Sequence, residues 1–185
     1  MKKIMQMALS GMVMMSYSSF AKSESGVYLS ASDFINRKPA YETECKIHLN
    51  NSIWDLPYIT VTSNGKKMRL QKDEIFGYID KEHNTHRFYK GNDYLVEESG
   101  NINIYLLTEK VSQSKGYKIV KRYYFSKDES ASILPLTFNN LKSVYSANEK
   151  FLTLLNDAYN NDDISGYDKI HNTYRVNYIY SVALK

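Results

Sequence analysis

Two neighbouring stretches with different hydrophobic periods decide the fold class: YKIVKRYYF at residues 117–125 and TFNNLKSVYSANEKFLTLLNDA at residues 137–158. The first is rich in the β-branched and aromatic residues that favour strands. In the second, apolar residues between Phe151 and Ala158 recur at the i, i+3, i+4 and i+7 spacing of an amphipathic helix. We therefore predict an α+β protein, in which helices after residue 130 pack on a sheet formed before it.

Thr137 and Ser146 are the predicted starts of the first two helices in this region. Thr137 lies two residues after Pro135 and is a good N-cap, because its hydroxyl can accept a backbone hydrogen bond. Ser146, with Glu149 three residues later, has the pattern of a capping box. Together with the segment that follows, these boundaries predict two or three C-terminal helices packed on the sheet.

A third helix is expected after residue 161, where Asp162 or Asp163 can serve as its cap. Its apolar residues would be Ile164, Tyr167, Ile170 and Tyr174. Beyond Arg175 the apolar residues alternate, a pattern that fits a strand as well as a helix, and we prefer a continued helix there.

Residues 26–127 carry the signals of an antiparallel sheet. A β-branched run at residues 58–62 leads into Asn64-Gly65, which favours a two-residue hairpin because both turn residues must adopt positive φ. A second hairpin is predicted around Gly100, and Gly77 marks a bulge or a close backbone approach. About seven or eight strands at this spacing predict a rolled or barrel-like antiparallel sheet.

The sheet and the helices are expected to form a single α+β domain over residues 22–185. Its β-rich part would span residues 26–127 and its helical part residues 135–182. The helical part alone is too short to bury a core of its own, so it is expected to pack on the sheet.

The first 21 residues have the pattern of a cleavable signal peptide. Two lysines precede an apolar segment at residues 4–15, and Ser19-Phe20-Ala21 supplies the small residues that a signal peptidase recognises. Cys45 is the only cysteine, so no lipid-attachment cysteine lies near the cleavage position and no internal disulfide can form. We expect an exported protein, periplasmic or extracellular, without a transmembrane segment.

The formal charge of the chain is +4, with the basic residues dispersed along it. The pairs Lys66-Lys67 and Lys121-Arg122 lie in strand-like patterns and are interpreted as solvated strand faces rather than as a stripe that follows phosphates. Nucleic acid is therefore not expected as a partner. The seventeen tyrosines fit a β-sheet with half-buried aromatic side chains.

Several short segments near the two ends of the predicted mature chain carry a resemblance to known proteins. They are GVYLSASDF (26–34), Lys38-Pro39, YFSK (124–127), LPLT (134–137), Asn140-Leu141 and YDKIH (167–171). These segments resemble small secreted proteins of Bacteroidetes-type bacteria, a group with no established activity. The resemblance implies a Gram-negative, exported protein, and it brings no functional residues with it.

His83 and His86 are the candidate metal ligands. They lie three residues apart, and Asp80 could supply a third ligand if the loop folds back. The alternative is that this segment is a solvated turn. The chain contains neither a Gly-x-Ser-x-Gly nucleophile motif nor a glycine-rich phosphate loop, so no catalytic residue and no cofactor is predicted.

Trp54, Tyr58, Tyr123 and Phe125 are the candidate ligand-binding residues. Exposed aromatic side chains along a groove or at the mouth of a rolled sheet suit a glycan, a peptide or an apolar ligand. The alternative is that Trp54 and half of the 123–125 run belong to the core, because a strand buries one of its faces.

The favoured interpretation is a non-enzymatic binding or envelope-interaction module, and the sequence leaves its ligand or envelope-protein partner and its oligomeric state open. A small-molecule carrier with an apolar barrel interior is one alternative. A hydrolase or metal-dependent enzyme that uses His83 and His86 is the other.

Overall fold

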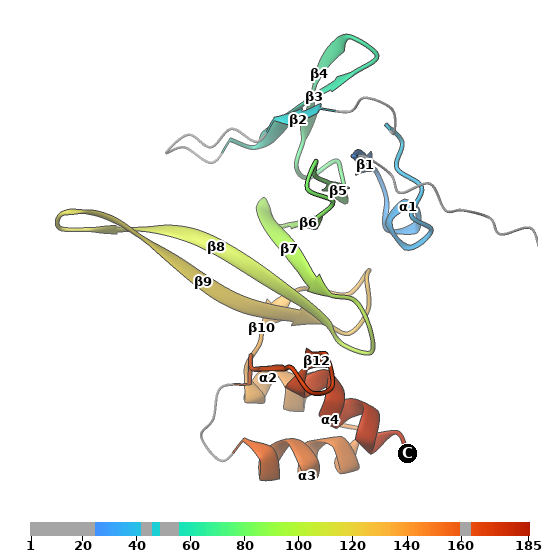
Figure 1. Cartoon of the computed structure of the whole chain (residues 1–185), viewed down its shortest axis with the longest axis vertical. Helices are drawn as coiled ribbons and strands as arrows, with labels where there is room; N and C mark the ends of the chain where they lie inside the picture. The colour runs from blue at the N-terminus through green and yellow to red at the C-terminus, as the bar shows by residue number, and fades with distance from the viewer. Residues whose placement is uncertain (1–24, 42–45, 49–55, 160–163) are drawn as a thin grey trace, which may run out of the picture.

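The computed structural model describes residues 25–41, 46–48, 56–159 and 164–185 (Figure 1). Within these ranges the fold is mixed α+β, as predicted, with a large antiparallel sheet and helices gathered mostly near the C-terminus. The predicted signal peptide, Cys45 and Trp54 lie outside the described residues. No helix in the described ranges is long and apolar enough to cross a membrane.

In the described part of the chain the main sheet has seven antiparallel strands, in the order β1-β5-β6-β7-β8-β9-β10. They are β1 (Gly26–Tyr28), β5 (Gly77–Ile79), β6 (Thr85–Tyr89), β7 (Asn92–Glu98), β8 (Asn103–Gln113), β9 (Gly116–Ser126) and β10 (Leu134–Pro135). The sheet is not closed, so the barrel-like part of the prediction is wrong. β10 is two residues long, and its Pro135 has no N–H with which to extend the ladder toward another strand.

A second sheet of three strands takes up part of the sequence that we assigned to one rolled sheet. It consists of β2 (Lys46–His48), β3 (Tyr58–Ser63) and β4 (Lys66–Gln71) in that order. The predicted Asn64-Gly65 hairpin joins β3 to β4 and is confirmed, with φ angles of 50° and 74° at the two residues. Ile59 and Val61 of β3 share a hydrophobic cluster with Tyr78 of the main sheet, so the two sheets are joined by packing.

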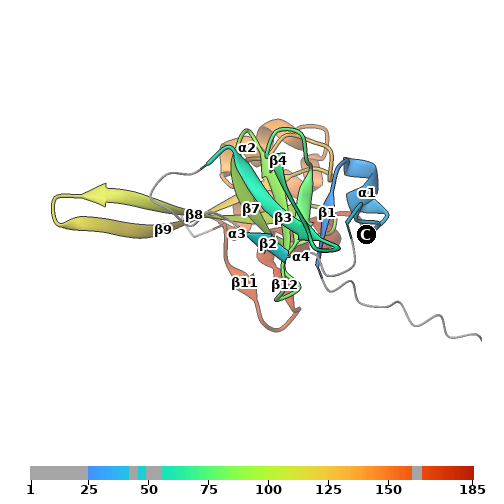
Figure 2. The ribbon, with the colours of Figure 1, turned by 90° about the horizontal axis from the view of Figure 1, so that it is seen from above.

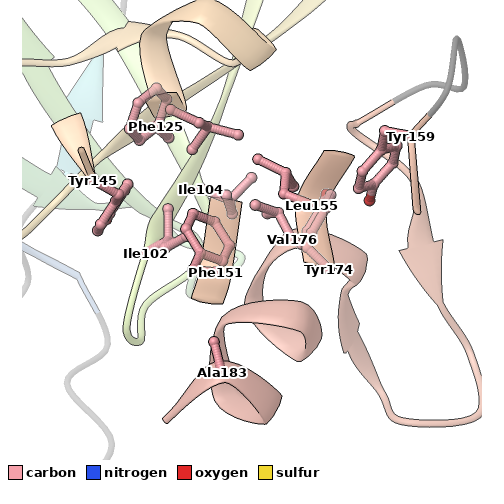
Figure 3. Packing of buried hydrophobic residues seen from close by; sticks show 11 residues of the cluster. Ile102, Ile104, Phe125, Tyr145, Phe151, Leu155, Tyr159, Tyr174, Val176 and Ala183 are labelled. Carbon is pink, nitrogen blue, oxygen red and sulfur yellow. The ribbon is translucent and has the colours of Figure 1, made fainter. Parts of the chain in front are cut away.

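Three helices near the C-terminus pack against β8 and β9 of the main sheet. They are α2 (Phe138–Val144), α3 (Glu149–Ala158) and α4 (Arg175–Ala183), and a short α1 (Ala31–Ile35) lies near β1 (Figure 1). Ile104 and Phe125 on the sheet share one core cluster with Phe151 and Leu155 on α3 (Figure 3). The spacing of four between these two helix residues places both on the buried face, as the sequence period predicted.

The structure confirms one predicted helix cap and corrects the other. Thr137 caps α2, because its Oγ1 accepts a backbone hydrogen bond at 3.3 Å. α3 begins after Asn148, whose Oδ1 accepts from Phe151 N at 3.0 Å, so the capping box predicted at Ser146 is wrong. Asn and Ser cap helices about equally well, and local pattern alone does not choose between them.

Residues 167–174 form a hairpin where the third helix was expected. β11 (Tyr167–Asp168) pairs with β12 (Thr173–Tyr174), so that part of the helix prediction is wrong. Asp168 favours the turn because its Oδ1 accepts hydrogen bonds from the backbone N–H groups of Ile170 and His171. The helix preferred beyond residue 175 is confirmed as α4.

Glu98, the last residue of β7, attaches α4 to the main sheet. Its Oε2 accepts from Tyr174 N at 2.8 Å, and its Oε1 accepts from Asn177 Nδ2 at 2.8 Å. Tyr174 is the N-cap residue of α4 and makes no side-chain capping bond. The carboxylate of Glu98 therefore caps this helix from another element, where its charge also complements the helix dipole.

Candidate functional site

The outer part of the β8–β9 hairpin extends beyond the main sheet as a two-stranded arm. β7 pairs with β8 only as far out as the Leu95–Leu106 pair, whereas β8 and β9 remain paired out to Gln113 and Gly116. We call residues 108–122 the arm. Figures 1 and 2 show it projecting away from the rest of the molecule, and every residue from 110 to 119 is exposed.

The arm concentrates positive charge. Its basic residues are Lys110, Lys115, Lys118, Lys121 and Arg122, and Glu109 is its single acidic residue, which gives a formal charge of +4. The whole chain also has a formal charge of +4, so the remainder is formally neutral. Arg122 Nε lies 2.9 Å from Glu109 Oε2, and the acidic group of the arm is therefore already paired.

The cross-strand register divides the side chains of the arm between two faces. Directly opposed residues of an antiparallel pair share a face, and successive residues along a strand alternate between faces. One face, which we call the acid-free face, carries Thr108, Lys110, Ser112, Tyr117, Ile119 and Lys121. The other, which we call the Glu109 face, carries Glu109, Val111, Gln113, Gly116, Lys118, Val120 and Arg122. All the negative charge of the arm thus lies on one side.

Tyr117 and Ile119 form an exposed apolar centre on the acid-free face, with 64% and 56% of their surfaces accessible. Lys110 Nζ lies 5.4 Å from the centroid of the Tyr117 ring, a cation–π contact that helps to order both side chains. Val111 on the Glu109 face is also exposed. Scattered exposed apolar residues are normal, but several on one projecting hairpin indicate a contact surface.

A group of polar side chains crosses β5, β6 and β7 inside the main sheet; we call Tyr78, Asp80, His86 and Asp93 the His86 cluster. His86 Nδ1 lies 2.9 Å from Asp93 Oδ1, and its Nε2 lies 3.3 Å from Asp80 Oδ2. Tyr78 Oη donates to Asp93 Oδ2 at 2.6 Å, and its ring stacks on the imidazole with the centroids 4.4 Å apart. Each member is therefore bonded within the cluster.

The charges of the cluster support one another. Burial lowers the pKa of His86, but the hydrogen bond and charge of Asp93 and the charge of Asp80 outweigh burial and raise that pKa above its ordinary value. Burial likewise opposes ionisation of Asp80, but hydrogen bonds from Asn84 and the charge of His86 leave the pKa of Asp80 lowered. Both nitrogens of His86 are engaged and Tyr78 is fully buried, so the cluster cross-links strands and offers no free general base.

The two candidate metal ligands lie in different settings. His83 is exposed in the turn between β5 and β6, with a φ of 65°, whereas His86 lies in β6 between two carboxylates. In the part of the chain that the structure describes, no three His, Cys, Asp or Glu side chains are grouped so that they could hold a metal ion. The metal hypothesis for His83 and His86 stays a prediction.

The aromatic candidates do not share one surface in the described residues. Trp54 lies outside these residues, and Tyr58 is half-buried in β3, with Arg69 Cζ 4.9 Å from its ring centroid. Tyr123 packs against the helix-covered core, and Phe125 lies fully buried within it (Figure 3). Phe125 therefore matches the alternative interpretation, in which part of the 123–125 run is core.

The arm is the candidate site that sequence reasoning missed. The alternation of lysines with Tyr117 and Ile119 was visible, but it is equally typical of an ordinary solvated strand face. What makes it an arm is the position at which β7 stops pairing with β8, and this is a long-range property.

No protein-family model matches the chain, and comparisons with curated proteins and with solved structures found no match either.

Proposed function

We propose that the chain is an exported binding module that contacts a component of the cell envelope through the arm. The observation that carries the proposal is the concentration of a formal charge of +4 on a projecting hairpin whose residues 110–119 are all exposed. A two-stranded ribbon is marginally stable without a third strand and adds little to the core. Contact with something outside the molecule explains its length and charge.

The two alternative functions have less support. A carrier with an apolar barrel interior needs a closed sheet, and the seven-stranded sheet is open. An enzyme that uses His83 and His86 needs a free base or free metal ligands, and both nitrogens of His86 already face carboxylates.

Export is tested by the N-terminus of the protein that cells produce. The full chain is expressed in a Gram-negative host, recovered from the periplasm or the medium, and analysed by intact-mass spectrometry. Cleavage after Ala21 predicts a chain that begins at Lys22. Recovery from the cytoplasm with the first 21 residues retained would contradict the export part of the proposal.

Envelope contact is tested with a shortened arm. Asn-Gly replaces residues 110–119, so that the paired residues Glu109 and Val120 flank a two-residue turn. Both proteins, purified as the cells process them, are sedimented with washed bacterial envelope membranes. We expect the shortened protein to bind at least about tenfold more weakly, because each lysine near an anionic surface contributes about 1 kcal/mol.

Two controls accompany the sedimentation. The unfolding midpoint of the shortened protein should match that of the wild type, because every residue from 110 to 119 is exposed and none belongs to a hydrophobic core cluster. Ile170→Ser removes an apolar residue that is 90% exposed on the β11–β12 turn, away from the arm, and should sediment like the wild type. Equal sedimentation of the wild-type and shortened proteins rules the proposal out.

A further inference from the structure

The acid-free face of the arm combines an apolar centre with cations beside it. Ile119 lies opposite Lys110 in the strand register, and Tyr117 lies under the ammonium group of Lys110 at 5.4 Å. Lys121 follows Ile119 along the same face of β9, opposite Thr108. The face therefore presents an aromatic and an aliphatic side chain next to two lysines, without a negative charge.

This arrangement has the chemistry of a surface that rests on a lipid headgroup layer. A tyrosine ring with its hydroxyl suits the boundary between headgroups and acyl chains, and an aliphatic side chain gains by leaving water. Lysine side chains can extend along apolar surface and place their ammonium groups among lipid phosphates. From this match, and on the basis of the proposed function, we infer that the arm binds a membrane surface rich in anionic phospholipid, with the acid-free face against the headgroups.

The division of the arm into an acid-free face and a Glu109 face favours a flat binding partner over one with a groove. A bilayer surface touches one side of a ribbon, which keeps Glu109 and its partner Arg122 on the side turned away from the lipid phosphates. A nucleic-acid groove that admits a two-stranded ribbon has walls on both sides, so Glu109 would lie near phosphates there. The end of the hairpin, Ser114-Lys115, is polar, so the arm lies along the surface and does not insert tip first.

The test compares variants that change the two faces by equal charge. Lys110→Gln with Lys121→Gln removes two positive charges from the acid-free face, and Lys118→Gln with Arg122→Gln removes two from the Glu109 face. Each protein is sedimented with vesicles of phosphatidylcholine alone and of phosphatidylcholine mixed equally with phosphatidylglycerol. All forms share the same N-terminus, so differences between them report on the arm.

We expect the wild type to bind the phosphatidylglycerol vesicles and to leave the phosphatidylcholine vesicles unbound. The acid-free-face variant should bind about 25-fold more weakly, since each of its two lysines at an anionic surface is worth about fivefold, and the Glu109-face variant should lose less. Tyr117→Ser with Ile119→Ser should also weaken binding more than Val111→Ser with Val120→Ser. Unfolding midpoints close to the wild type establish that every variant is folded.

Equal loss in the two charge variants overturns the inference, because it would mean attraction by net charge without a contacting face. Failure of the wild type to bind phosphatidylglycerol vesicles overturns it too, as does capture of the wild type by double-stranded DNA or polyglutamate in place of the vesicles. If in those cases the wild type still sediments with envelope membranes and the shortened protein does so more weakly, the lipid inference fails and the proposed function stands. If it sediments with neither, both fail.

Discussion

The side-chain amide of Asn177 makes both backbone hydrogen bonds of Ile102. Asn177 Oδ1 accepts from Ile102 N at 3.0 Å, and Asn177 Nδ2 donates to Ile102 O at 2.8 Å. Ile102 directly precedes β8, and Asn177 lies in α4, 75 residues further along the chain. Both residues are buried, so this one amide connects the C-terminal helix to the hairpin that bears the arm.

Asn177→Ala is therefore expected to destabilise the protein strongly. The substitution leaves a buried N–H and a buried C=O of Ile102 without partners and removes one donor to Glu98, at a cost of about 3 kcal/mol in the free energy of unfolding. Urea denaturation followed by circular dichroism measures it. Asn156→Ala, at an exposed position of α3, is the matched control and should change stability by about 0.5 kcal/mol or less. A difference below about 1 kcal/mol between the two variants would contradict this account of Asn177.

Gly77→Ala should separate β5 from β6. The sequence suggested a bulge or a close approach at Gly77, and the structure has a close approach: an added Cβ would overlap the carbonyl oxygen of His86 on the neighbouring strand. We expect a loss of about 2 kcal/mol or more in urea unfolding, because a backbone contact cannot move aside as a flexible side chain can. At Gly100 an added Cβ meets nothing within 4 Å, so Gly100→Ala is the control and should be nearly neutral. An equally neutral Gly77→Ala would contradict the close approach of Gly77 to the backbone of His86.

His86 should make stability decline as the pH rises from 6.5, its unfolded pKa, through its raised folded pKa. Burial lowers the pKa of His86, but Asp93 and Asp80 raise it by more, so the folded pKa lies above the unfolded value of 6.5. A raised pKa stabilises the fold fully below the unfolded value, and the contribution is lost as the pH rises through the folded value. Asp80, whose pKa is lowered, acts in the opposite direction and loses its contribution as the pH falls toward its folded value.

Urea unfolding at a series of pH values from about 6 to about 9 measures the effect, in the window set by the raised pKa of His86. The wild type should lose stability over this range, and His86→Gln should lose less. Asp93→Asn removes the partner that raises the pKa of His86 most and should flatten the profile in the same way. Parallel profiles for the wild type and His86→Gln would show that the cluster does not carry the pH dependence.

The elements that the sequence predicted correctly are those that depend on residues close together in the chain. Asn64-Gly65 forms its turn because both residues accept positive φ, and Thr137 caps α2 through a backbone group three residues away. The period from Phe151 to Leu155 gives α3 its buried face without reference to any partner. The N-cap of α3 was predicted at Ser146 but lies at Asn148. The two residues are equally suitable as caps, and the packing of the helix selects Asn148.

Features that depend on distant residues were not predictable from local pattern. The strands divide between two sheets because β2 and β4 pair with β3 rather than with a strand of the main sheet. The hairpin at Asp168 is a local exception. Its carboxylate accepts hydrogen bonds from the backbone N–H groups two and three residues later, and apolar spacing does not register this competition with the helix. The arm likewise depends on how far β7 follows β8, so the charge of residues 108–122 was interpreted as that of an ordinary strand face.

Hydrogen exchange followed by mass spectrometry, with and without vesicles of phosphatidylcholine and phosphatidylglycerol, shows whether the arm is the part of the protein that binds the membrane. In the free protein the arm should exchange faster than the base of the same hairpin around Ile104 and Phe125. Among the described residues, no third strand pairs with the arm and none of its residues belongs to a hydrophobic core cluster. With phosphatidylglycerol vesicles, exchange should slow in peptides that cover residues 108–122 and stay unchanged in β3 and β4. Two results would contradict the claim that the arm is the binding element. One is vesicle-bound protein whose arm exchanges at the rate of the free protein, and the other is slowed exchange only outside residues 108–122.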